Sequence, residues 1–288
     1  MHRRFALRAL AATPLLAAGT GCALKQVHLE ERNFLPNAPT ALIDEGIRRV
    51  NVALKVEDDV LLHGWHLQHP QPRALLIDFL GNGDNVLAYA GQIHEIAQHF
   101  QVDVLALDYR GSGASGGHKR FLNLRSDALR IHDELARPLA AQRGGLPLLA
   151  WGYSMGSMPA IHLAARRPLA GLAVLAGFSD FPDVRAGLET GMPWFAKPFV
   201  KLSWDPVFEM RPQPVDEIAE VRAPIFLFHG EADAQLPVRC GDRLNEAAAQ
   251  ARWKRYVRAP GVGHGRLPLF KGEARTALEA WLAESLQT

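Results

Sequence analysis

Short apolar runs alternate along this chain with longer segments that have the spacing of amphipathic helices, and this alternation limits the possible folds more than any other feature. Strands that are apolar on both faces and separated by helices indicate a mostly parallel sheet with helices on each side. The first two runs are expected to form a hairpin. Strands are predicted at 50–56, 60–67, 74–80, 102–108, 146–151, 172–176, 225–229 and 254–258, and helices at 85–100, 122–137, 155–166, 239–251 and 273–286.

The composition is that of a globular chain with ample material for a core. Of its 288 residues, 48% are hydrophobic and 22% are charged. The formal net charge is +2, and three of the arginines stand in the first 21 residues. A chain so close to neutral, without a basic run, offers no basic surface for the phosphates of a nucleic acid, so that class of partner is excluded.

The first 21 residues have the pattern of an export signal. A basic start is followed by an apolar stretch at 9–18 and then by Gly19-Thr20-Gly21-Cys22. The apolar stretch is about half the roughly 20 residues that a membrane-spanning helix needs. Small residues directly before Cys22 resemble a bacterial lipoprotein signal, although Gly19 departs from it. The alternatives are an ordinary signal with Cys22 as a bystander, or a twin-arginine signal at Arg3-Arg4.

The domain organisation follows from this signal and from the strand pattern. We expect a signal peptide at 1–21, a tether at 22–49 and one domain at 50–288. An anchor on Cys22 would hold the exported chain on the periplasmic side of a bacterial envelope, and Ala23 hints at the outer membrane. The remaining cysteine, Cys240, then has no partner for a disulfide and is interpreted as an apolar filler.

The alternation breaks at about 179–223, where six prolines are interleaved with aromatic residues. We interpret this stretch as a small cap inserted after the sixth strand. Its aromatic side chains either line an apolar substrate pocket or only hold the cap in place.

Two stretches fit the pattern Gly-x-Ser-x-Gly, one around Ser115 and one around Ser154. This pattern forms a sharp turn from a strand into a helix that exposes the serine. Ser154 follows the apolar run 146–151 and opens a helix-like segment, whereas Ser115 lies in a glycine-rich loop with no helix directly after it. Ser154 is therefore the candidate nucleophile, and Ser115 is interpreted as a turn residue.

A serine nucleophile needs a base and a group that orients the base. The order expected on such a sheet is serine, acid, histidine. Asp233 lies in the loop after the strand 225–229, and His264 stands between glycines after the last predicted strand. Asp180 is the alternative acid.

Acyl transfer also needs N–H donors for the developing oxyanion. One is expected to be the amide of Met155, and the other to come from the loop 80–85, where a helix beginning near Asn85 would add a positive dipole end. A nucleotide-binding interpretation of this loop lacks the glycine spacing and a P-loop lysine. His63, His66 and His69 invite a metal interpretation, but their spacing along a strand places neighbours on opposite faces. No metal or organic cofactor is expected.

Five motifs in this order resemble the α/β-hydrolase superfamily, and within it the serine-hydrolase branch of Bem46-like proteins and serine-aminopeptidase-like lysophospholipases. They are the loop 80–85, the turn 108–116, the Ser154 elbow, the segment 229–237 and Gly263-His264. The resemblance covers about 50–286. It implies an α/β-hydrolase fold with an eight-stranded sheet, and a backbone oxyanion donor at Asn82. The loop departs from the family in having Leu80 where histidine is usual.

These observations lead to one main hypothesis, an exported serine hydrolase that cleaves a small-molecule carboxylic ester or thioester with an acyl or lipid-like group. Ser154, His264 and Asp233 would be catalytic, Met155 and Asn82 would hold the oxyanion, and Cys22 would carry the lipid that binds the membrane. The alternatives are a peptidase of the serine aminopeptidase type and a non-catalytic envelope lipoprotein that uses the fold for binding.

Overall fold

The computed structural model describes residues 25–29, 46–56, 59–191, 194–195, 198, 200–265 and 267–287. An eight-stranded sheet runs through its centre in the order β10-β9-β7-β6-β4-β5-β3-β2, and every neighbouring pair is parallel except β2–β3 and β3–β5. The strands are β2 (Arg48–Lys55), β3 (Leu61–Gln68), β4 (Leu75–Phe79), β5 (Asp103–Leu107), β6 (Leu148–Tyr153), β7 (Gly171–Leu175), β9 (Ile225–Gly230) and β10 (Lys254–Ala259). The predicted mostly parallel sheet of eight strands is therefore confirmed.

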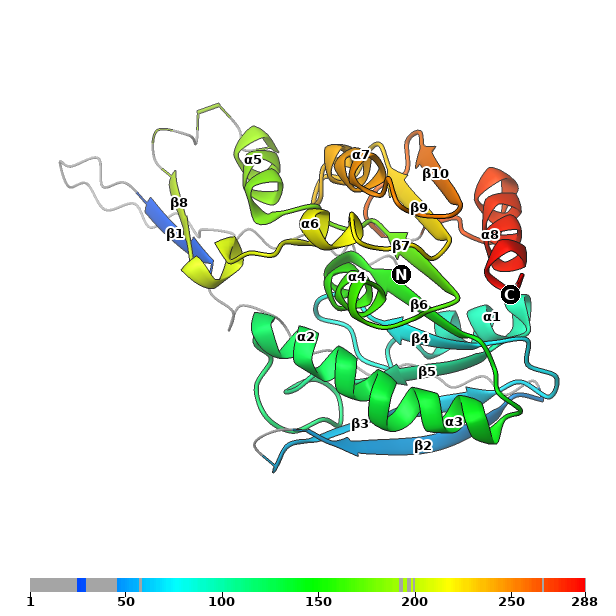
Figure 1. Ribbon diagram of the computed structural model, residues 1–288. Helices are drawn as coiled ribbons and strands as arrows, with labels where there is room; N and C mark the ends of the chain where they lie inside the picture. The colour runs from blue at the N-terminus through cyan, green and yellow to red at the C-terminus, as the bar shows by residue number, and fades with distance from the viewer. Residues whose placement is uncertain are drawn as a thin grey trace, which may run out of the picture.

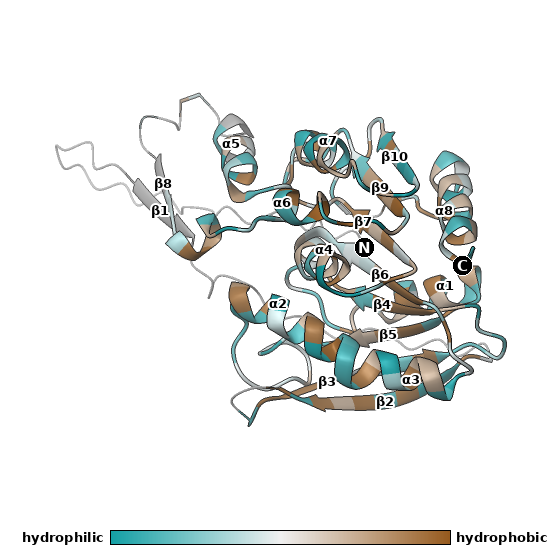
Figure 2. Ribbon diagram, viewed as in Figure 1, coloured by the Kyte–Doolittle hydropathy of each residue, from teal (hydrophilic) through white to brown (hydrophobic). Residues whose placement is uncertain are grey.

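The central strands are buried along their whole length, which is why the sequence shows them as uninterrupted apolar runs. Every residue of β4, β5, β7 and β9 is buried. Figure 2 shows hydrophobic residues concentrated in these strands, while the covering helices carry hydrophobic and hydrophilic residues together. Helices must therefore cover both faces of the sheet.

Two layers of helices do so (Figure 1). One face holds α2, α4, α6 and α7 in a row, and the other holds α1 and α8, where Trp151 of β6 packs between Phe100 of α1 and Trp281 of α8. The helices are α1 (Ala90–Phe100), α2 (Phe121–Arg130), α3 (Arg137–Gln142), α4 (Ser157–Arg166), α6 (Pro214–Ile218), α7 (Val238–Ala247) and α8 (Gly272–Ser285), and the π-helical stretch η3 (Ile131–Ala136) joins α2 to α3.

The segment between β7 and β9 leaves the sheet and forms the cap. It contains α5 (Phe181–Gly191), β8 (Val200–Trp204), the 3-10 turn η6 (Pro206–Glu209) and α6. The strand β1 (Lys25–Leu29) pairs in parallel with β8, and Figure 1 shows this pair standing apart from the large sheet. Phe181 stacks on Phe208 and meets Trp204 edge to face, so these aromatic residues of the cap pack against one another.

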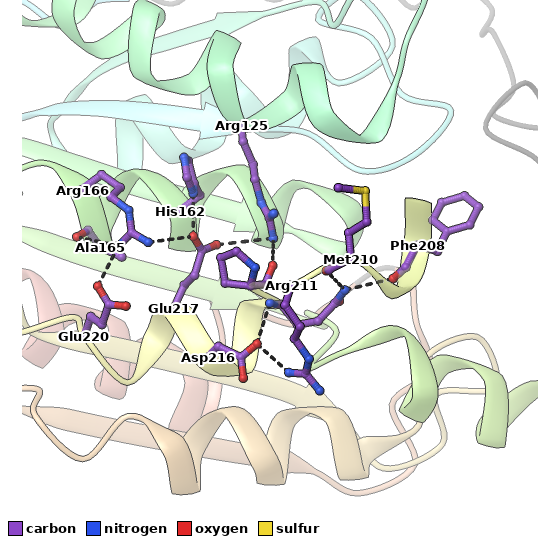
Figure 3. A network of polar contacts seen from close by, with 12 residues as sticks. Arg125, His162, Ala165, Arg166, Phe208, Met210, Arg211, Asp216, Glu217 and Glu220 are labelled. Atoms are coloured by element: carbon purple, nitrogen blue, oxygen red, sulfur yellow. Dashed lines mark hydrogen bonds and ion pairs between the residues drawn. The ribbon is translucent and has the colours of Figure 1, made fainter. Parts of the chain in front are cut away.

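A buried carboxylate fastens the end of the cap to the core (Figure 3). The side chain of Glu217 in α6 is fully buried, and its Oε1 lies 2.7 Å from His162 Nδ1 and 3.4 Å from Arg166 Nη2, both on α4. Its Oε2 lies 3.5 Å from Arg125 Nη2 on α2, and the same guanidinium donates to the carbonyl of Pro212. A buried carboxylate is tolerable only with such partners, so this network fixes α6 on α2 and α4.

Three parts of the structure differ from the prediction or lie outside it. Helix α1 begins at Ala90, not near Asn85, because residues 85–89 form a turn in which the Asn85 side chain accepts the amide of Ala88. The predicted signal peptide and Cys22 lie outside the described residues. Within the predicted tether, residues 25–29 form β1 and residues 48–49 already belong to β2. No helix in the described part of the chain is long and apolar enough to cross a membrane.

Candidate active site

The turn after β6 presents Ser154 at the carboxyl end of the sheet. The strand passes directly into the turn η4 (Ser154–Gly156) and then into α4, and Ser154 has a φ of 54°. This left-handed conformation costs a non-glycine residue on the order of 1–3 kcal/mol and is found mainly at functional sites. Gly156 is needed because a Cβ there would lie 1.9 Å from the carbonyl oxygen of Phe79 at the end of β4. The elbow geometry predicted from the motif is therefore present.

The structure brings His264 and Asp233 to this serine. His264 Nε2 lies 2.8 Å from Ser154 Oγ, although the two residues are 110 positions apart. The other ring nitrogen, Nδ1, lies 2.7 Å from Asp233 Oδ2. Because the carboxylate accepts the Nδ1 proton, Nε2 is left with a lone pair directed at the hydroxyl. The three side chains thus form one hydrogen-bonded chain from the carboxylate to the hydroxyl.

Asp233 is held in its charged form. Burial by itself would raise its pKa, but hydrogen bonds from His229, His264 and the Leu236 amide outweigh burial and hold the pKa well below the usual range. Its second oxygen, Oδ1, accepts the amides of Gln235 and Leu236, each at 2.8 Å. A carboxylate with this many donors is ionised at neutral pH, so it can orient His264 there.

Two further side chains position the histidine and the acid. His229 Nε2 donates to the carbonyl of Leu236 at 3.0 Å and lies 3.6 Å from Asp233 Oδ2, so it holds the loop that carries the acid. Tyr153, next to the nucleophile, donates its hydroxyl to the main-chain oxygen of His264 at 2.7 Å, and the two rings lie 5.4 Å apart. Sequence reasoning gave neither residue a role. Tyr153 acts on a residue 111 positions away along the chain, whereas His229 stands only seven positions before Leu236, inside the segment 229–237 that the sequence analysis had singled out.

The loop 80–85 lies against this turn. Gly81 packs so closely on the Tyr153 ring that a Cβ there would lie 2.9 Å from Tyr153 Cδ1, and Asn82 is exposed beside it. The amide of Met155 opens the helical turn directly after the nucleophile. Both predicted oxyanion donors therefore belong to segments that meet at the elbow. The positive helix end expected from Asn85 is displaced, since α1 begins five residues later.

The same loop carries a carboxylate that the sequence analysis did not single out. Asp84 is half-buried. Burial is the largest cause of the raised pKa values of Tyr89 and Tyr153, and the charge of Asp84 is the next largest. It also opposes the effect of burial on Lys119, whose pKa is lowered to about 8. The loop therefore combines backbone N–H groups with a negative side chain. Its acidic character was visible in the sequence, but its closeness to Tyr153 was not.

The second Gly-x-Ser-x-Gly stretch has a structural use. Ser115 Oγ donates to the carbonyl of Asp108 and accepts the amide of His63, each at 2.8 Å. Both hydrogen-bonding functions of this buried hydroxyl are thus used in holding a turn against β3. The interpretation of Ser115 as a turn residue agrees with these contacts.

The other candidates from the sequence lie in different surroundings. Asp180, the alternative acid, accepts the amide of Asp183 at the start of α5 and pairs with Arg243 at 2.8 Å. His66 is buried against Asp103 at 3.1 Å, and no group of three or more metal-ligating side chains is found among the described residues. Cys240 is buried, and burial raises the pKa of its thiol to about 11. None of these residues joins the chain from Asp233 to Ser154.

Comparison with known proteins places this architecture in a family. The family model described as serine aminopeptidase, S33, matches residues 70–211, a stretch that contains the Ser154 elbow and the loop 80–85. The chain belongs to the α/β-hydrolase superfamily. It is similar to an uncharacterized protein of Mycobacterium tuberculosis, with 28% identity over 82% of this chain and 79% of the relative. It is also 24% identical to the lysophosphatidylserine lipase ABHD12 of Danio rerio, over 56% of this chain and 43% of that one.

Solved structures show the same fold for this superfamily member. An esterase of Pyrococcus furiosus superposes with a TM-score of 0.66 at 19% identity, covering 87% of this chain and 98% of the esterase. A puromycin-hydrolyzing peptidase of Mycobacterium tuberculosis gives a TM-score of 0.57 at 17% identity, covering 84% of this chain and 39% of the peptidase. At these identities the likeness concerns the fold, and the chemistry has to be argued from the site.

Proposed function

We propose that this superfamily member is a serine hydrolase that cleaves a carboxylic ester or thioester through Ser154, His264 and Asp233. The observation that carries the proposal is the continuous chain of short contacts, 2.7 Å from Asp233 to His264 and 2.8 Å from His264 to Ser154. A serine hydroxyl is a poor nucleophile unless a positioned base removes its proton, and this geometry supplies that base.

The reaction follows from these contacts. His264 Nε2 takes the hydroxyl proton as Ser154 Oγ attacks the substrate carbonyl, and Asp233 stabilises the imidazolium that forms. His264 then gives the proton to the departing alkoxide or thiolate, which leaves an acyl-enzyme on Ser154. A water molecule, deprotonated by the same nitrogen, attacks this ester and releases the acid. The serine recovers its proton, so each cycle consumes one water.

The oxyanion formed in both steps needs donors that are fixed in advance. We assign them to the amides of Met155 and Asn82. The close packing of Gly156 on Phe79 and of Gly81 on Tyr153 supports this assignment, because it holds the elbow and the loop together. Backbone donors do not depend on the histidine that Leu80 replaces.

An acyl or lipid-like substrate is the class that we favour. The similarity to a lysophosphatidylserine lipase supports it. The family model named for a serine aminopeptidase and the carboxylate of Asp84 on the oxyanion loop favour a second candidate, a peptidase that would attract a substrate amine. We further propose export by residues 1–21 and a lipid anchor on Cys22, on the periplasmic side of an envelope and in the outer membrane.

Fluorophosphonate labelling of the chain from residue 22 onward tests the proposal. The protein should be labelled, Ser154→Ala should lose the label and at least about 10⁴-fold in turnover, and Ser115→Ala should keep both. Nitrophenyl esters, an acyl thioester and an aminoacyl nitroanilide, assayed on the same samples, separate esterase from peptidase activity. A folded parent protein that neither labels nor turns over any of them would refute the proposal and favour the binding lipoprotein. Palmitate incorporation that is lost in Cys22→Ser tests the anchor.

A further inference from the structure

Two half-buried tyrosine side chains connect the loop 80–85 with the backbone of the catalytic histidine. Tyr89 stands in the turn directly before α1, and its ring centroid lies 6.3 Å from that of Tyr153. Tyr153 in turn donates its hydroxyl to the main-chain oxygen of His264 at 2.7 Å. The turn that delays the start of α1 therefore places Tyr89 beside the tyrosine that holds His264.

Asp84 lies at the other end of this connection. Its carboxylate folds back over Gly81, because a Cβ added at Gly81 would lie 2.6 Å from Asp84 Oδ2 and 2.9 Å from Tyr153 Cδ1. The Tyr89 hydroxyl hydrogen-bonds with the side chains of both Asp84 and Tyr153. A hydrogen bond to a carboxylate is stronger than one between neutral groups, so Asp84 fixes the Tyr89 hydroxyl against that of Tyr153.

The position of His264 is the quantity that these contacts control. Its Nε2 lies 2.8 Å from Ser154 Oγ, and a misplacement of about 1 Å can slow an enzyme on the order of 100-fold. His264 also stands between Gly263 and Gly265, and glycine restricts the backbone least. A side chain that fastens the main chain here therefore limits how far the imidazole can move.

We propose that Asp84 and Tyr89 are positioning residues, which keep His264 in line with Ser154 by fixing the Tyr153 hydroxyl. The inference rests on the proposed function and deepens it, because it concerns the same base. The loop that supplies the Asn82 amide would thereby be fastened to the segment that supplies the histidine. Asp84 acts here through its hydrogen bond and not by attracting a substrate amine.

Kinetics on a neutral nitrophenyl ester test these roles. Asp84→Ala and Tyr89→Phe should each lower kcat about fivefold with KM unchanged, which is the effect of losing about one hydrogen bond. Asp84→Asn keeps an acceptor oxygen for Tyr89, so it should retain most of the kcat. In a Tyr153→Phe background neither Asp84→Ala nor Tyr89→Phe should lower kcat further, because the link to His264 is already cut.

Hydrogen exchange separates this inference from the proposed function. The amides of residues 261–265 should exchange about fivefold faster in Asp84→Ala and in Tyr89→Phe than in the parent, whether or not the protein hydrolyses an ester. Asp242→Asn is the matched control, because Asp242 on α7 also accepts a tyrosine hydroxyl, that of Tyr256 at 3.0 Å. Neither kcat nor the exchange of residues 261–265 should change in this control.

The possible outcomes are distinct. Faster exchange in an inactive parent's variants would count against the hydrolase and leave the connection from Asp84 to His264 standing. Unchanged kcat and exchange in Tyr89→Phe, a variant that removes one oxygen atom and so should fold, would overturn the inference. So would losses that multiply in the Tyr153→Phe background. An Asp84→Asn variant as impaired as Asp84→Ala, with a raised KM, would instead place Asp84 in substrate binding.

Discussion

Asp78 offers a quantitative test of the electrostatics near Asp84 in the loop 80–85. It is the last residue but one of β4 and is 4% exposed, and its Oδ2 has no hydrogen-bond partner among the described residues. The small cavity beside it is lined by apolar side chains from β3, β5, α2 and η3, together with Asp108 and Asp127. Burial, and after it the nearby charge of Asp84, raise the pKa of Asp78 from 3.8 to about 7.

A raised pKa on a buried acid makes stability depend on pH in one direction. Below about pH 4 the carboxyl group is protonated in both the folded and the unfolded chain, so it imposes no penalty. Between about pH 4 and pH 7 the unfolded chain loses this proton first, so the free energy of unfolding falls as the pH rises. The total loss is about three pKa units at about 1.4 kcal/mol each, or roughly 4 kcal/mol, and it is complete above about pH 8.

Asp78→Asn keeps the size of the side chain and removes the titration. In urea unfolding the variant should be more stable than the parent by up to about 4 kcal/mol at pH 8, but by only about 1.5 kcal/mol at pH 5. Asp59→Asn, at a side chain that is 86% exposed, is the matched control and should shift stability equally at both pH values. A gain from Asp78→Asn that is the same at pH 5 and pH 8, or a loss at pH 8, would refute this reasoning.

Three further substitutions each test the contacts of one side chain. Ser115→Ala should lower the free energy of unfolding by about 1–3 kcal/mol, because the Ser115 hydroxyl joins two buried backbone groups. Fluorophosphonate labelling should stay intact, and its loss would contradict the turn role. Tyr153→Phe should lower kcat roughly tenfold with little change in KM, since it frees the backbone of His264; an unchanged kcat would count against positioning. Glu217→Gln should lower the free energy of unfolding by about 3 kcal/mol and make residues 206–218 the first site of proteolysis. First cleavage elsewhere would argue against Glu217 as the residue that holds the cap on the core.

The central sheet could be predicted from the sequence because its signal is local. A strand covered on both faces has to be apolar throughout, and all eight predicted strands agree with the structure to within two residues at each end. The cap was predicted only from the interruption that it makes in the alternation of strands and helices. Its strand β8 pairs with β1, which the sequence places in a tether far upstream, and no local pattern specifies a partner so distant.

The Ser154 elbow could also be predicted, because the strand, the turn and the helix that form it are neighbours in the sequence. The same local pattern around Ser115 lacked the helix, and its hydroxyl is indeed engaged in a turn. The start of α1 was misplaced, since the Asn85 side chain caps a separate turn before the helix begins.

The sequence by itself thus determined which segments are buried as strands, which serine stands at the elbow, and the order in which acid and histidine follow. Only the tertiary structure decided that Tyr153 holds the backbone of His264 and that Asp180 is tied to Arg243 and not to the histidine. It also decided that Asp78 Oδ2 is buried without a hydrogen-bond partner among the described residues. The reason is physical. Burial and backbone geometry leave a periodic pattern in neighbouring residues, whereas hydrogen bonds and charge interactions depend on distances in space that the fold alone sets.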